Sequence, residues 1–104
     1  MSESLPYIRE LGAYRKTGTD NSGWIVMRSG LDIPAQLHLL AGDGRFETTG
    51  SDLAAIDADT AVANPVTGDQ TAPWSDGLYP VPTAVRFVGT GTWAIQQAAT
   101  AVRS

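Results

Sequence analysis

Hydrophobic and polar residues alternate with a period of two along much of this chain, which is the pattern of β-strands with one buried face. In the C-terminal third, two such segments, 84–88 and 92–96, each place two bulky apolar side chains on one face. The tripeptide Gly89-Thr90-Gly91 separates them, and glycine supplies the positive φ that short hairpin loops often need. The pattern predicts a β-hairpin over these residues.

A second pair of alternating segments lies earlier in the chain. Residues 36–41 place Leu37 and Leu39 on one face, and residues 45–49 follow after a glycine–aspartate–glycine tripeptide. Such a tripeptide between two alternating runs is a strong hairpin signal. A compact apolar run, residues 24–28, predicts one more strand.

The segments between these strands are less regular. Residues 50–63 fit either one helical turn, capped by Ser51 or Asp52, or irregular strand. Residues 64–83 carry four of the six prolines, so we expect them to run mostly unpaired over the surface. Six to eight short strands predict an all-β fold, a small antiparallel β-sandwich or jelly-roll-like domain with an N-terminal arm.

The N-terminal segment differs from the rest of the chain. Four of its apolar side chains fall at the spacing of one helical face, which favours a short amphipathic helix followed by a linker. We therefore divide the chain into an arm or short helix plus linker, residues 1–23, and a β domain, residues 24–104. The arm either packs along its own sandwich as a first strand or reaches a neighbouring subunit. Its candidate interface residues are Tyr7, Ile8, Leu11 and Tyr14.

Composition narrows the class of partner. Only 17% of the 104 residues are charged and 42% are hydrophobic, which suits a surface that lies against other proteins and equally a modestly charged soluble β domain. The net charge is −4 and the basic residues are scattered. A nucleic-acid partner is not expected, because binding to phosphates requires a basic patch or stripe.

The chain contains no cysteine, which excludes disulfides, thiol nucleophiles and cysteine-based zinc sites. We expect it to fold in a reducing cytoplasm or to gain stability by assembly. The first residues lack the basic and apolar regions of a signal peptide, and no apolar run approaches the roughly 20 residues that span a bilayer. Secretion by a signal peptide and a membrane location are therefore not expected.

No pattern of catalytic or metal-binding residues is present. His38 is the single histidine, and its alternation with leucines predicts a solvated or interface imidazole on a strand. The pair Asp57 and Asp59 lacks the glycine and glutamate that complete an EF-hand loop. We expect no enzyme activity, no cofactor and no metal.

Two aromatic residues lie outside the strand patterns. Trp74 and Tyr79 flank Ser75-Asp76-Gly77 in the proline-rich stretch, whereas Trp24 and Trp93 fit the core. An exposed aromatic ring can stack on a sugar or anchor a protein interface, and it can also cap the end of its own core. Trp74 and Tyr79 are therefore candidate contact residues.

The run PVPTAVRFVGTGTWAIQQ, residues 80–97, resembles the closing hairpin of small virion proteins of tailed bacteriophages, among them capsid decoration (cement) proteins, head fibres and tail-fibre modules. The resemblance implies a structural protein that bridges and stabilises major capsid subunits, works as a homo-oligomer such as a trimer, and resides in the virion after synthesis in the host cytoplasm. The alternative is a non-catalytic recognition module, a tail-fibre or sugar-binding domain that uses exposed aromatic residues.

Overall fold

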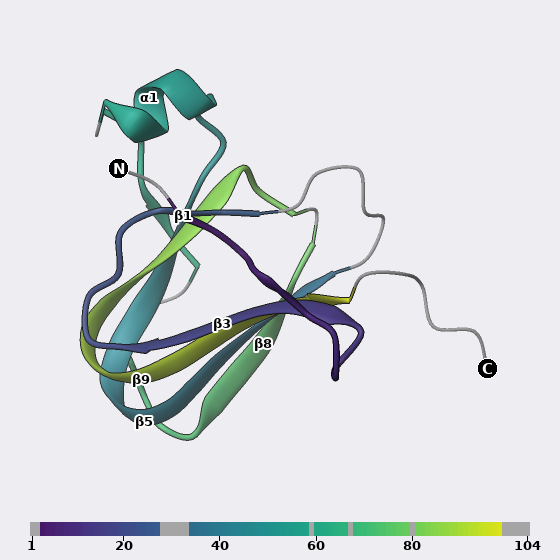
Figure 1. The fold of residues 1–104 in the computed structure, drawn as a ribbon. Helices are drawn as coiled ribbons and strands as arrows, with labels where there is room; N and C mark the ends of the chain where they lie inside the picture. The colour runs from purple at the N-terminus through teal and green to yellow at the C-terminus, as the bar shows by residue number, and fades with distance from the viewer. Residues whose placement is uncertain (1–2, 28–33, 59, 67, 80, 99–104) are drawn as a thin grey trace.

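The computed structural model of this chain describes residues 3–27, 34–58, 60–66, 68–79 and 81–98. They form nine strands in one sheet and one short helix (Figure 1). All strand pairs are antiparallel except β1 with β4. The predicted class, a small antiparallel all-β domain, is confirmed. The elements are β1 (Glu3–Ser4), β2 (Tyr7–Ile8), β3 (Ala13–Thr19), β4 (Ile25–Val26), β5 (Ala35–Thr49), α1 (Leu53–Asp57), β6 (Asn64–Pro65), β7 (Gln70–Thr71), β8 (Trp74–Leu78) and β9 (Ala84–Ala98).

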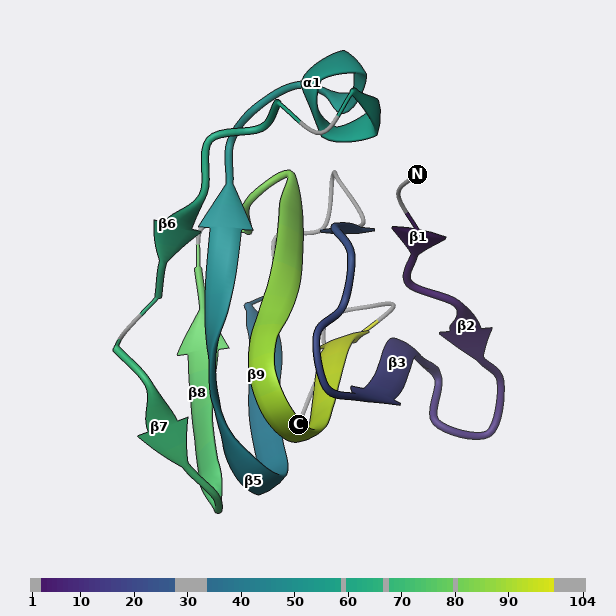
Figure 2. The same cartoon turned by 90° about the vertical axis from the view of Figure 1, so that its left-hand side faces the viewer.

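Two long strands, β5 and β9, form the centre of the fold. Each has 15 residues, and they pair antiparallel from Gln36 with Gln96 to Thr49 with Ala84. Both strands curve sharply near their middle (Figures 1 and 2). The two strands together form a curved ribbon. On one side of the curve, β8 pairs with β5 and β3 pairs with β9. On the other side, β6 pairs with β5 and β4 pairs with β9. We call these parts the β3–β8 half and the β4–β6 half of the sheet.

The two predicted hairpins are wrong, because each predicted pair of strands is one continuous strand. The two glycine-containing tripeptides lie opposite each other at the curve, where Gly42 pairs with Gly91 and Gly44 with Gly89. Gly42 has a φ of 79°, and a Cβ there would clash with the carbonyl oxygen of Thr90. The glycines therefore allow two backbones to approach closely where the ribbon bends, and a local pattern cannot distinguish such a bend from a hairpin loop.

The main core lies between the two halves. Inward-facing residues of β5 and β9 on both sides of the curve belong to one buried cluster, as alternation along each strand requires. Phe87 packs between Phe46 and Trp93, with ring centroids 5.3 and 6.3 Å away. The buried members are Leu5, Ile25, Met27, Ala35, Leu37, Leu39, Phe46, Val85, Phe87, Trp93 and Ile95.

The N-terminal segment is a pair of strands, so the predicted amphipathic helix is wrong. The chain turns between β2 and β3, where Leu11 donates its N–H to the carbonyl of Ile8 at 3.1 Å. Gly12 has a φ of 60°, which a right-handed helix does not allow. β3 then pairs with β9 along its whole length, and Leu5 is completely buried in the core. The segment therefore packs along its own sheet, which was the first of the two arrangements considered for the arm.

The stretch from residue 50 to residue 79 contains both expected and unexpected structure. The helical alternative is found at α1, where the Asp52 carboxylate caps the helix by accepting the N–H of Ala55 at 2.9 Å. Ile56 packs against Trp24 and Ala84 on the outer face of the β4–β6 half. The proline-rich stretch is paired in part, because β6, β7 and β8 pair with β5, while the other described residues of the stretch lie outside strands. In the described part of the chain, no helix is long and apolar enough to cross a membrane.

The glycine pairs predict a sharp contrast between two substitutions. Gly42→Ala should lower the free energy of unfolding by about 2 kcal/mol or more, because it adds backbone strain and a clash with the facing strand. Gly50→Ala is the matched control, since a Cβ there has no atom within 4 Å and should change stability by less than about 0.5 kcal/mol. Urea unfolding of both variants measures the difference; equal midpoints would contradict the role of the bend.

Candidate functional site

The four candidate residues of the N-terminal segment lie together on the β2–β3 hairpin. Tyr7 pairs with Tyr14 across the two strands, and their rings meet edge to face with centroids 5.3 Å apart. Tyr14 and Ile8 are half-buried, and Tyr14 also packs against the main core. Tyr7 and Leu11 remain 51% and 55% exposed. The hairpin thus presents two large apolar side chains on a framework that the core holds in place.

The two candidate aromatic residues of the proline-rich stretch do not come together. Trp74 begins β8, is half-buried, and stacks on Phe46 with ring centroids 6.0 Å apart. Tyr79 follows the other end of β8 and is 60% exposed. The five residue-to-residue steps from Trp74 to Tyr79 span roughly 16 Å of extended chain. Trp74 therefore covers the edge of the core, whereas Tyr79 is exposed beyond the opposite end of β8.

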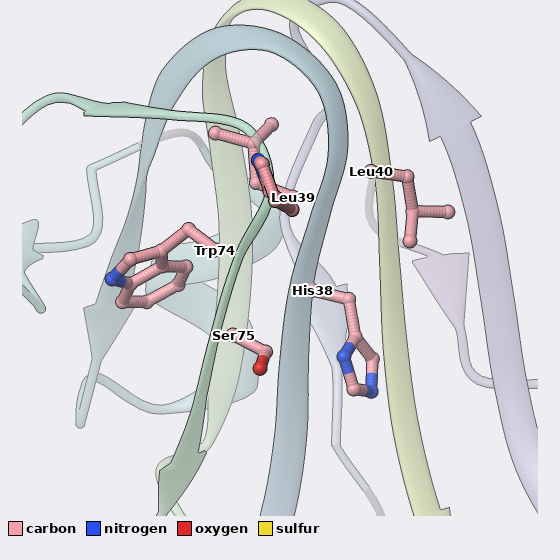
Figure 3. Close-up of a pocket in the computed structure, with 6 residues that line it drawn as sticks. His38, Leu39, Leu40, Trp74 and Ser75 are labelled. Atoms are coloured by element: carbon pink, nitrogen blue, oxygen red, sulfur yellow. The ribbon is translucent and has the colours of Figure 1, made fainter.

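A shallow hollow lies beside Trp74, between β5 and β8 (Figure 3). Its volume is about 260 Å³. The Trp74 and His38 rings point away from each other, with Ser75 between them (Figure 3). The register shift after Leu39 is a bulge that leaves Leu40 half exposed at the rim. The lining residues are His38, Leu39, Leu40, Pro73, Trp74 and Ser75.

His38 is the one titratable residue among those that line this hollow. Partial burial lowers the pKa of His38, and the nearby positive charge of Arg15 lowers it further, so the imidazole is neutral at pH 7. None of the lining residues is acidic, so no carboxylate there orients the ring as a catalytic triad requires. Among the residues that the structure describes, no group of three possible metal ligands occurs.

The sequence analysis missed a charged cluster on the outer face of the β4–β6 half. Glu47 lies opposite Arg86 on neighbouring strands. Its Oε1 accepts a hydrogen bond from Nε of Arg86 at 2.8 Å and forms an ion pair with Nη2 of the same residue at 2.8 Å. The other oxygen, Oε2, accepts from Nε of Arg45 at 3.0 Å. Arg45 reaches Asp69 at 3.2 Å. The alternation Arg45-x-Glu47 was visible in the sequence, but the partner on β9 was not.

This cluster is structural rather than a binding site for an anion. The Glu47 side chain is only 9% exposed, and burial alone would raise its pKa. The hydrogen bonds from Arg86 and Arg45 outweigh that effect, so the pKa of Glu47 lies below its usual value of 4.5. Arg86 also lies over the Trp24 ring, with Cζ 4.4 Å from the ring centroid. Arg86 thus links Glu47 of β5 to the apolar cluster that Trp24 and Ile56 form.

The chain matches no protein-family model, no curated protein and no solved structure. Among the described residues, the exposed apolar tip of the β2–β3 hairpin and the hollow beside Trp74 are candidate contact surfaces.

The Glu47 cluster predicts a defined pH dependence of stability. Glu47→Gln should lower the free energy of unfolding at pH 7 by about 1–3 kcal/mol, because hydrogen bonds to a charged group are lost. Since the folded-state pKa is depressed, the wild-type advantage is present above pH 4.5 and shrinks as the pH falls below that value. Urea unfolding of both proteins across this range measures the difference.

The matched control for this prediction is Asp69→Asn, which removes the exposed acidic partner of Arg45. The Asp69 side chain is 71% exposed, so its loss should cost less than about 1 kcal/mol. A wild-type advantage over Glu47→Gln that stays constant to the lowest pH at which both proteins fold would contradict the assigned ion pairs.

Proposed function

We propose that this protein is a non-catalytic structural protein of a tailed-phage virion, and that it decorates the capsid by bridging neighbouring major capsid subunits. The observation that carries the proposal is the β2–β3 hairpin. It presents Tyr7 and Leu11 to solvent at the edge of the sheet, while Leu5 on one side and β3 on the other fix it to the domain.

The hairpin has the composition of a protein contact. A tyrosine and a leucine provide apolar anchors, and the exposed Arg9 and Glu10 of the turn provide a polar rim. Interfaces gain most of their affinity from a few such anchors surrounded by polar residues. A rigid hairpin also loses little conformational entropy on binding, which favours a small contact.

Assembly in many copies makes modest contacts sufficient. Each copy of a decoration protein that touches two capsid subunits links them, and the second contact forms at high effective concentration. The low charge content of the chain, 17%, supports this use, because few charges must be desolvated on contact. The capsid gains cohesion from the sum of such links.

The proposal does not rest on a hairpin in the C-terminal part of the chain. Residues 84–98 are one strand in the centre of the sheet, so the resemblance of this run to a closing hairpin does not extend to its structure. The alternative, a recognition module that uses Trp74 and Tyr79, is the less favoured proposal, because the two residues lie at opposite ends of β8 and Trp74 is half-buried against Phe46.

The location of the protein tests the proposal directly. Antibodies against the purified protein, applied with gold labels to phage particles released by the organism that encodes this chain, should label the capsid in electron micrographs. Label on the tail tip would favour the recognition module instead. Particles without label, from cells that synthesise the protein, would contradict any virion role.

Rebinding of purified protein to particles that lack it tests the hairpin. The double variant Tyr7→Ser, Leu11→Ser should bind at least about tenfold more weakly, because it loses both apolar anchors. Leu53→Ser on α1 is the matched control, since Leu53 is equally exposed at 54% and lies on a different face. Equal binding by the double variant and the wild type would show that another surface makes the contact.

A further inference from the structure

The chain contains two Asp–Gly sequences, Asp43-Gly44 and Asp76-Gly77, and the fold holds them differently. In such a sequence the backbone nitrogen of the glycine can attack the side-chain carboxyl of the aspartate, because glycine has no Cβ to hinder the approach. Within a strand this attack needs local opening, since the backbone must rotate to bring the nitrogen onto the carboxyl carbon. The two sequences therefore differ in reactivity by how easily each part of the sheet opens.

The first Asp–Gly sequence is held at the bend of β5. Asp43 and Gly44 pair with β7 on one side and with β9 on the other. Gly44 is buried, and a Cβ at this position would clash with the ring of Phe87. Rotation of the backbone here would separate the two central strands, so it requires nearly complete unfolding. The bend thus explains the glycine and also protects the aspartate.

The second Asp–Gly sequence lies on an edge strand. Among the described residues, β8 pairs only with β5, and both Asp76 and Gly77 are exposed. Oδ1 of Asp76 accepts the N–H of Gly77 at 2.9 Å, so the nitrogen already lies beside the carboxyl group that it would attack. An edge strand opens at a lower free energy than the centre of a sheet, because fewer contacts are lost.

The fold does not require glycine at position 77. A Cβ there would lie 3.8 Å from its nearest neighbour, Nε2 of Gln36, which is an ordinary contact. The backbone φ of Gly77 is not positive, unlike that of Gly44. Gly77 therefore makes Asp76 reactive without a structural role that explains the glycine.

We propose that Asp76 is a site of spontaneous isoaspartate formation and that Asp43, in the same dipeptide, is not. The nitrogen of Gly77 forms a bond to Cγ of Asp76, a C–O bond of the carboxyl group breaks, and the amide proton leaves with the hydroxyl as water. Water then opens the cyclic imide. Cleavage of the new N–Cγ bond restores aspartate, whereas cleavage of the original peptide bond leaves the chain running through Cγ. Water is the only co-reactant, and nothing is oxidised or reduced.

Isoaspartate would change the pairing of β8, because it adds one atom, Cβ, to the backbone. Beyond that atom, Gly77 and Leu78 lose their register with Gln36 and Ala35 of β5. Leu78 packs against the main core, so this end of β8 loosens from the sheet. The modification thus marks older copies of the protein by a weakened edge strand, and this chemistry does not depend on any role in a virion.

Incubation of the purified protein under native conditions tests the proposal. Peptide mapping by chromatography and electron-transfer mass spectrometry should show isoaspartate forming at residue 76 at least roughly tenfold faster than at residue 43, because β8 opens more readily than the bend. In the chain unfolded by guanidinium chloride, the two sites should react at similar rates, because both are Asp–Gly. The proposal fails if the folded protein forms isoaspartate equally fast at both sites. It also fails if residue 76 forms none over a period in which the unfolded chain does.

Gly77→Ala is the matched variant, since the fold has room for a Cβ at this position. The variant should form isoaspartate at residue 76 roughly tenfold more slowly or less, because the methyl group hinders the attacking nitrogen. Aged wild-type protein should unfold at a lower urea concentration than fresh protein, whereas ageing should leave the midpoint of Gly77→Ala unchanged. An equal fall of the midpoint in both proteins would contradict the assigned loss of register in β8.

Discussion

The fold depends on how closely two backbones can approach at one bend. β5 and β9 cross from one half of the sheet to the other as a single ribbon, and the inner side of that bend has no room for side chains at the facing glycines. Because the ribbon bends there, its apolar faces turn toward each other and exclude water between them. The remaining strands attach to the edges of this ribbon.

The surface available for function follows from that arrangement. The central strands have neighbours along both edges over most of their length, so the backbone groups and apolar tips that remain open to other molecules lie mainly on the outer strands and the turns. The N-terminal segment crosses the open side of the sandwich, contributes Leu5 to the core, and carries the hairpin outward. Its stabilising residues and its exposed residues alternate in a stretch of only a few positions, so one short segment both closes the core and presents the contact surface.

The sequence predicted the composition of the core better than its connections. Alternation correctly placed the inward residues of β5 and β9, because burial acts on each residue locally. It could not decide whether a glycine tripeptide ends a strand or bends it, since that choice depends on the partner strand. Tyr7, Ile8, Leu11 and Tyr14 fit both a helical face and a hairpin, and only pairing with β9 selects the hairpin. The Arg86 partner of Glu47 and the bulge at Leu40 likewise depend on strand register, which one sequence does not encode locally.

The central position of β9 has a consequence for synthesis of the chain. β9 is the last strand described, yet β3, β4 and β5 all pair with it. Until this strand has left the ribosome, the earlier strands lack their principal partner, and their apolar faces stay exposed to chaperones or to other nascent chains. Most contacts in this sheet join residues distant in sequence, which slows folding further. A premature stop before residue 84 would therefore leave a product without a core, rather than a smaller domain.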